Sequence, residues 1–148
     1  MLLAFLASAT LAPALEPLQF LVGHCWRTSL EEGPTDTHCF AALTGGFQIR
    51  DYHTVRKDGR SVYTGESLFT AAAGKLHFRY TGSTGAHLEG PMHVEADKII
   101  FEDVDKTGSE TWWRQIDATH YEDVTVAPPE LAQFNQRKLF ELVPDETP

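Results

Sequence analysis

Residues 44–80 read TGGFQIRDYHTVRKDGRSVYTGESLFTAAAGKLHFRY, and this stretch decides the fold. Gly45-Gly46, Asp58-Gly59 and Ala73-Gly74 are turn pairs, and the segments between them alternate polar and apolar side chains. Turns that join short alternating segments predict consecutive antiparallel hairpins. Similar turn signals recur about every ten residues along the rest of the chain, and no segment between them has the pattern of a long helix.

Ten strands are expected from this spacing of turns, after one short helix at 16–22. Pro17 suits the start of that helix and Gly23 suits its end. We expect the strands at 24–30, 35–42, 46–56, 61–71, 75–81, 86–95, 98–104, 110–116, 119–126 and 136–143. The sequence therefore predicts an all-β protein, an antiparallel up-and-down β-barrel of about ten strands with a short N-terminal helix.

Composition limits the classes of partner. The chain has 148 residues, which fits one domain, with 21 acidic residues against 12 basic ones and a net charge of −9. Nucleic-acid-binding proteins need a basic stripe, and adhesion to anionic membranes needs a basic surface. We therefore expect one domain that binds no nucleic acid and does not adhere to anionic membranes. The apolar run at Leu2 to Leu11 is too short to span a bilayer, so no stable insertion into a membrane is expected either. Nothing in the sequence indicates an oligomeric state.

The first 14 residues differ in character from the rest. Leu2 to Leu11 is apolar and uncharged, and Leu11-Ala12-Pro13-Ala14 ends in an A-x-A cleavage pattern. This predicts a secretory signal peptide cut after Ala14, although no Lys or Arg precedes the apolar run. The alternative is a buried N-terminal helix. Export implies a periplasmic or secreted bacterial protein, with the barrel domain at 15–143 and a disordered tail at 144–148.

The two cysteines, Cys25 and Cys39, flank the turn at Glu32-Gly33-Pro34. They fall opposite each other if the hairpin is centred on Glu32, and an oxidising compartment would allow a disulfide between the two strands. The alternative is a pair of free thiols that pack as small apolar side chains. The spacing is not that of a CxxC redox motif or a zinc site. We expect a structural disulfide.

One short motif resembles a known family. The run Phe20-Leu21-Val22-Gly23-x-x-Trp26 resembles the opening of lipocalin-like, or calycin, barrels, although two residues separate Gly from Trp here and true lipocalins have one. The Thr44-Gly45-Gly46 turn and the Gly65-Glu66-Ser67 segment are similar to secreted bacterial lipocalin-like families that have no established activity. The resemblance implies that Trp26 plugs the barrel floor. It bears on the fold far more than on any function.

Residue parity identifies the side chains that would line such a barrel, because successive side chains point to opposite faces of a strand. We take the side chain of Trp26 as inward, and the assigned turn lengths then determine which side chains face inward on each following strand. We assign two residues to the turns at Gly45-Gly46 and Asp58-Gly59, and three to the turn at 72–74. The predicted inner face is Trp26, His38, Phe40, Phe47, Ile49, Asp51, His53, Val55, Glu66, Leu68, Leu76, Phe78 and Tyr80, continued by Leu88, Met92 and Val94.

This inner face is mostly apolar, with a polar cluster of His38, Asp51, His53 and Glu66 in its middle. Three interpretations are open: a structural network joined by Arg114, a polar anchor for a ligand, or a metal ion held by two histidines and a carboxylate. Asp51 is expected opposite Glu66, and one of two such close carboxyls could serve as a general acid or base. A register slip of one residue would turn the whole cluster outward.

An apolar cup with a polar centre favours binding of a small apolar or amphipathic molecule. The candidate ligand-binding residues are Trp26, His38, Phe40, Asp51, His53, Glu66, Phe78, Tyr80 and Arg114. No local histidine motif, nucleophile elbow or phosphate loop is present, so we assign no metal ligand, no cofactor and no catalytic residue. A binding protein is favoured over a barrel enzyme with an Asp/Glu/His acid–base cluster. Two further classes stay open: a periplasmic metal-binding calycin, and an envelope protein that binds another protein through its outer wall.

Overall fold

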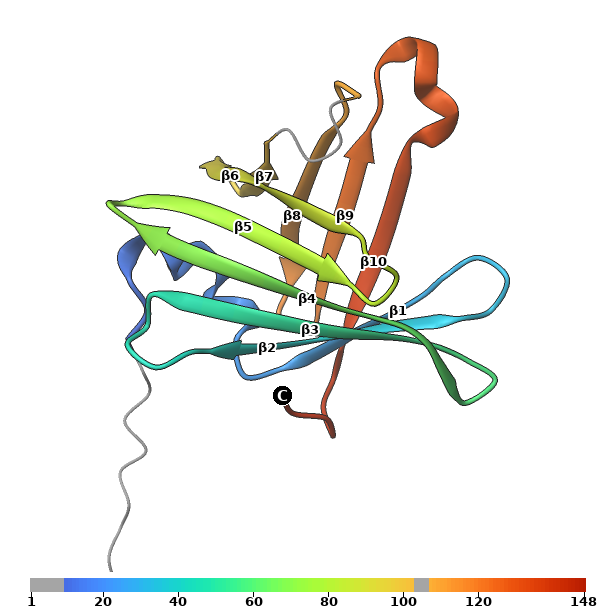
Figure 1. Ribbon diagram of the computed structural model, residues 1–148, viewed down its shortest axis with the longest axis horizontal. Helices are drawn as coiled ribbons and strands as arrows, with labels where there is room; N and C mark the ends of the chain where they lie inside the picture. The colour runs from blue at the N-terminus through green and yellow to red at the C-terminus, as the bar shows by residue number, and fades with distance from the viewer. Residues whose placement is uncertain (1–9, 103–106) are drawn as a thin grey trace, which may run out of the picture.

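The computed structural model describes residues 10–102 and 107–148. Within these ranges ten antiparallel strands close into a barrel, in which each strand pairs with the next in the chain and β1 pairs with β10 (Figure 1). The strands are β1 (Cys25–Ser29), β2 (Thr35–Ala42), β3 (Gln48–Lys57), β4 (Arg60–Ala72), β5 (Lys75–Gly82), β6 (His87–Glu95), β7 (Lys98–Phe101), β8 (Glu110–Asp117), β9 (His120–Val126) and β10 (Gln136–Val143). Two short 3-10 helices are η1 (Pro13–Leu21) and η2 (Pro129–Phe134).

The predicted fold class is confirmed, and every predicted strand is present. Asp58 and Gly59, with φ of 51° and 75°, both adopt the left-handed conformation of a two-residue hairpin turn that matches strand twist. The helix predicted at 16–22 begins earlier, at Pro13. The last two positions of the strand predicted at 98–104 lie outside the described residues.

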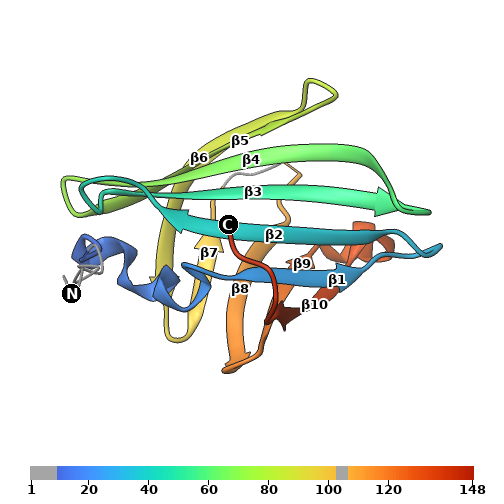
Figure 2. The same cartoon turned by 90° about the horizontal axis from the view of Figure 1, so that it is seen from below.

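One end of the barrel is closed by η1 (Figure 2). Leu15, Leu18 and Leu21 project from this helix and are fully buried in the main core. Trp26 is 1% exposed beside them, and its ring meets Tyr121 edge-on at a centroid distance of 5.4 Å. Trp26 therefore forms part of the barrel floor, as the resemblance implied.

The first hairpin has the predicted register. Cys25 lies opposite Cys39, and the two form a disulfide between β1 and β2. On the next pair of strands His38 lies opposite His53, also as predicted. These two registers fix the inward side of β2 and β3, where the polar residues of the interior lie.

The predicted inward positions on β4 are wrong. Lys57 pairs with Arg60 across the expected turn, but Val55 pairs with Tyr63, so Val62 is an extra residue that forms a β-bulge. The bulge shifts the alternation of inward and outward side chains along β4 by one position. The turn residues alone do not reveal this shift. Glu66 and Leu68 therefore face outward, and Ser67 and Phe69 take their places inside.

A second difference from the prediction, in the β4–β5 turn, brings the predicted inward positions on β5 back into agreement with the structure. The β4–β5 turn has two residues, Ala73 and Gly74, and not the predicted three, since Ala72 pairs with Lys75. Phe78 and Tyr80 consequently face inward as predicted. Phe47, predicted to face inward, is 62% exposed because it lies in the turn that precedes β3.

Both terminal segments of the described chain contact the barrel. Leu11 is 4% exposed, and the amide of Ala12 donates to the carbonyl of Gly46. The predicted cleavage point after Ala14 falls within η1. In the tail predicted to be disordered, Glu146 forms an ion pair of 2.6 Å with Arg27. Across the described residues, no helix has the length and apolar character needed to cross a membrane.

Candidate functional site

The half of the barrel away from η1 encloses a pocket of about 290 Å³. Side chains from nine of the strands, β2 to β10, line it, and they include both aromatic rings and ionisable groups. The lining residues are Asp36, His38, Asp51, His53, Ser67, Phe69, Phe78, Tyr80, Leu88, Phe101, Thr111, Trp113, Asp123, Lys138 and Phe140. This volume is near the lower end of small-molecule sites, which occupy roughly 300–1,000 Å³.

Aromatic rings form the apolar part of the pocket. Phe101 and Trp113 meet at a centroid distance of 4.9 Å, and Phe78 meets Phe101 at 5.2 Å. Phe69 closes the group by an edge-on contact of 5.7 Å with Trp113. All of these contacts are T-shaped, an arrangement that aromatic pairs favour. The apolar wall is therefore rigid and offers ring faces and edges to an occupant.

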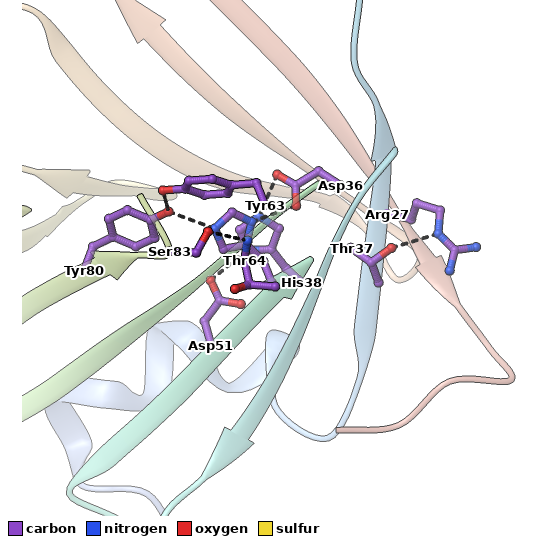
Figure 3. A network of polar contacts seen from close by, with 10 residues as sticks. Arg27, Asp36, Thr37, His38, Asp51, Tyr63, Thr64, Tyr80 and Ser83 are labelled. Atoms are coloured by element: carbon purple, nitrogen blue, oxygen red, sulfur yellow. Dashed lines mark hydrogen bonds and ion pairs between the residues drawn. The ribbon is translucent and has the colours of Figure 1, made fainter. Parts of the chain in front are cut away.

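The polar part is a chain of hydrogen bonds along β2 and β3 (Figure 3). His38 lies between two carboxylates, with its Nδ1 at 2.7 Å from Asp51 and its Nε2 at 3.2 Å from Asp36. The second oxygen of Asp36 contacts Nδ1 of His53 at 2.8 Å. The two imidazole rings stack at a centroid distance of 4.4 Å. Asp36 thus holds both histidines, one with each oxygen.

These contacts set the charge of the polar wall. Burial alone would lower the pKa of His38, but the charge of Asp51 and the hydrogen bonds to both carboxylates outweigh it and raise that pKa to about 10. Burial likewise favours neutral Asp36, but its hydrogen bonds with His38 and His53 hold its pKa well below the usual value. Near neutral pH, His38 is therefore a fixed imidazolium and Asp36 a fixed carboxylate.

The chain continues toward the open end through two phenols. Nε2 of His53 lies 3.0 Å from the hydroxyl of Tyr80, which lies 2.6 Å from the hydroxyl of Tyr63. Burial and the contact with Tyr63 raise the pKa of Tyr80, so Tyr80 keeps its proton and can donate to His53. A Cβ atom at Gly65 would overlap both His53 and Tyr80, and one at Gly82 would overlap Tyr63. These two glycines make room for the network.

Two buried oxygens stay outside the network. Oδ1 of Asp51 and the hydroxyl of Tyr121 have no hydrogen-bond partner among the described residues. Asp51 is 1% exposed and lines the pocket, while Tyr121 is fully buried nearer the floor. An unsatisfied buried polar atom costs free energy, about 1–3 kcal/mol and more for a charged group. Asp51 is therefore the acceptor that a donor entering the pocket would satisfy.

The pocket brings together five of the nine predicted ligand-binding residues: His38, Asp51, His53, Phe78 and Tyr80. Trp26 and Phe40 are buried in the core beneath it and do not line it. The remaining two predicted residues, Glu66 and Arg114, lie outside the barrel wall.

Glu66 and Arg114 have partners on the outer surface. Glu66 is turned outward by the bulge and lies 3.8 Å from Arg50. Arg114 faces outward because its neighbour Trp113 faces inward, and its Nη2 lies 2.6 Å from Glu122. The predicted pair of Asp51 and Glu66 therefore does not form, and Ser67 lies opposite Asp51 instead. Two close carboxyls that could share acid–base work are thus not found at this position.

Several pocket residues were missing from the predicted set. Asp36 shares the inward parity of His38 and is the hub of the network, so parity alone could have identified it. Phe69 and Ser67 were hidden by the bulge. Asp123 and Lys138 are cross-strand partners on β9 and β10, whose register no turn residue in the sequence fixes.

The pocket also contains a group that metal ions could use. Among the described residues, ligand atoms of Asp36, His38 and His53 lie within 4.8 Å of one another. A histidine binds a metal through a ring nitrogen without a proton. Both nitrogens of His38 face carboxylate oxygens, and its raised pKa of about 10 keeps both protonated. This arrangement fits an imidazolium better than a metal ligand.

A larger hollow of about 780 Å³ lies where β1 and β10 diverge. These strands pair only through Cys25–Arg27 and Glu141–Val143. Two of the charged groups along it already have partners, since Arg27 pairs with Glu146 and Arg137 with Glu122. The interior pocket, with its unsatisfied buried carboxylate, is therefore the stronger candidate.

In comparisons with protein-family models and with curated proteins, the chain finds no match. The closed antiparallel barrel of ten strands within the described residues is consistent with a calycin-like fold. A fold of this kind serves many functions, so the function has to be inferred from the pocket.

Proposed function

We propose that this chain is an exported, lipocalin-like bacterial protein that binds a small amphipathic molecule in the interior pocket. The observation that carries the proposal is the pocket of about 290 Å³, with an aromatic wall on one side and an ionised hydrogen-bond network on the other. Most small-molecule sites combine a largely apolar lining with a few placed polar groups. The ligand's body would contact the rings of Phe69, Phe78 and Trp113, and its polar end would face Asp51.

The barrel is suited to this role because only one half of it is filled. The leucines of η1 and Trp26 pack the floor completely, so the pocket has a closed base. Gly65 and Gly82 allow the polar network to lie against the wall. The site is thus held in shape before a ligand arrives, which lowers the entropic cost of binding.

Export is the other part of the proposal. The apolar stretch that ends near Ala14 has the pattern of a signal peptide, and disulfides such as Cys25–Cys39 persist in oxidising compartments. The periplasm or the medium is therefore the proposed location. N-terminal sequencing of the protein recovered from a periplasmic fraction tests it; a chain that starts at Leu15 agrees, and one that retains Met1 disagrees.

Binding is tested with N-phenyl-1-naphthylamine, an apolar dye whose fluorescence rises in apolar surroundings. The wild type should bind one dye per chain, and Ser67→Leu should weaken binding about tenfold or more because the added side chain fills the pocket. Ser61→Leu, the same change at an exposed position of the same strand, is the control and should bind as the wild type does. Equal binding by Ser67→Leu and Ser61→Leu, or none by the wild type, contradicts the proposal.

A further inference from the structure

We infer, on the basis of the proposed function, that the pocket selects an organic cation: an aromatic or apolar body that ends in a protonated amine and docks on Asp51. Such a ligand has a defined charge and defined hydrogen-bond donors at its polar end, which amphipathic character alone does not require. Three features of the pocket favour it: the local charge balance, one unsatisfied oxygen and the aromatic surroundings.

The local charge balance is negative. Along the polar wall, the imidazolium of His38 lies between the carboxylates of Asp36 and Asp51, at 3.2 and 2.7 Å. One positive charge between two negative ones leaves an excess of one negative charge. The whole chain carries a net charge of −9, which also attracts cations.

The excess negative charge is uncompensated at one buried atom, Oδ1 of Asp51. Both oxygens of Asp36 accept hydrogen bonds from histidines, and Oδ2 of Asp51 accepts one from His38. Oδ1 of Asp51 has no partner among the described residues, although the side chain is 1% exposed and lines the pocket. A protonated amine donates charge-assisted hydrogen bonds, which are stronger than those of a neutral hydroxyl. It is therefore the group that best satisfies this oxygen.

The opposite wall does not reverse this preference. Lys138 also lines the pocket and would attract an anion, but Asp123 is its direct cross-strand partner. Burial raises the pKa of Asp123, and the charge of Lys138 opposes that rise. The positive charge of Lys138 is thus partly compensated. The rings of Phe140 and Trp113 complete the lining, and aromatic faces stabilise cations and not anions.

Isothermal titration calorimetry at pH 7 with three indoles of similar size tests the inference: tryptamine, tryptophol and indole-3-acetate. They share one aromatic body and end in an ammonium, a hydroxyl and a carboxylate. Tryptamine should bind the wild type about tenfold more tightly than either of the others, the ratio expected for a charged hydrogen bond. Asp51→Asn should remove this preference, so that tryptamine and tryptophol bind the variant with similar affinity. Asp58→Asn, in an exposed turn, is the matched control and should keep the preference.

The outcomes separate the inference from the proposed function. If tryptophol or indole-3-acetate binds as tightly as tryptamine, or if Asp51→Asn keeps the preference, the inference is wrong and the binding function stands. If neither the indoles nor the naphthylamine dye binds, the proposed function fails and the inference with it. If Asp51→Asn does not fold, the trimethylated ammonium of tryptamine decides: it keeps the charge but has no N–H to donate, and it should bind the wild type more weakly than tryptamine.

Discussion

At the scale of single residues, His38 is the side chain on which the polar wall depends. It is held at both ring nitrogens by carboxylates, and one of these, Asp36, also holds His53. Four ionisable groups, His38, Asp36, Asp51 and His53, thus share one buried network. Removing one partner of a buried ion pair leaves the other uncompensated and typically costs about 3–5 kcal/mol.

His38→Gln is expected to destabilise the protein in a pH-dependent way. The pKa of His38 is raised from 6.5 to about 10 on folding, so its stabilisation is complete below pH 6.5 and is lost as the pH rises toward 10. The melting temperature of the variant should therefore lie well below that of the wild type at pH 6, and the difference should shrink by pH 9.5. His77→Gln, at an exposed histidine of β5, should show a small difference at both pH values. A His38→Gln difference that does not change with pH would contradict this account.

The stabilisation that Asp36 provides depends on pH in the opposite direction to that of His38. Its pKa is held below the ordinary 3.8, so its stabilisation is complete above that pH and is lost at lower pH. Together the two groups predict a stability maximum between about pH 4 and 6.5. The pH dependence of urea unfolding measures it, and an Asp36→Asn variant should show a smaller fall on the acid side than the wild type, since Glu122 and Asp117 also have lowered pKa values. A wild-type stability that is unchanged between pH 2 and 4 would contradict the prediction.

Gly65 is a second residue with a specific role, since a Cβ there would overlap the rings of His53 and Tyr80. Gly65→Ala is expected to cost about 1–3 kcal/mol in urea unfolding, as overpacking does. In a Tyr80→Phe background, where the hydroxyl is gone, the cost should be smaller. A cost below about 0.5 kcal/mol, the usual effect of a neutral surface change, would show that the network tolerates the added methyl.

At the scale of elements, β4 shows how a single residue decides which side chains a strand contributes to the pocket. The turn at Asp58-Gly59 was predicted correctly, but the bulge at Val62 shifted the inward and outward alternation of side chains on β4 by one residue. The β4–β5 turn is one residue shorter than predicted, so the two errors cancel and Tyr80 faces inward. The inner faces of β2, β3 and β5 were therefore predicted correctly, and that of β4 was not. A bulge has no strong sequence signature comparable to a two-residue turn.

Deleting Val62 tests the role of the bulge. Without this residue Tyr63 would follow Ser61 directly, so a regular ladder would keep Val55 opposite Tyr63 and Asp51 opposite Ser67. We therefore expect the deletion to keep dye binding and most of the stability, because Ser67 and Phe69 would still face inward and Glu66 would still face outward. Val62→Ser keeps the bulge at a position that is 57% exposed and should be nearly neutral. A Val62 deletion that no longer binds the dye would contradict the register described here.

The disulfide acts on the first hairpin. Cys25 and Cys39 are 14 residues apart, and a loop of about this length gains about 3 kcal/mol from a cross-link in the chain-entropy model. Replacing both by Ser should lower the melting temperature, and the wild type with a reductant should fall to a similar value. The double variant should not respond to the reductant. A melting temperature that is the same with and without the bond would show that the hairpin needs no covalent support.

At the scale of the whole molecule, the chain builds a barrel that is packed at one end and hollow at the other. The strands and their order were predictable because turn residues and alternation are local signals. The polar wall was largely predictable for the same reason, since Cys25–Cys39 and His38–His53 pairing follow from turn positions. The contribution of β9 and β10 was not predictable, because Asp123 and Lys138 are placed by barrel closure and not by a tight turn.

The central claim is that the hollow end holds one small organic molecule. Native mass spectrometry of the protein, purified from the cells that produce it without refolding, tests this most directly, with a denatured sample as the control. We predict one noncovalent adduct per chain in the wild type, lost on denaturation and absent from Ser67→Leu. The same spectrum should show a mass two hydrogens lower than that of the reduced chain, because Cys25 and Cys39 are bonded. A wild type at the bare mass of the chain, or an adduct equally abundant in Ser67→Leu, would contradict the account.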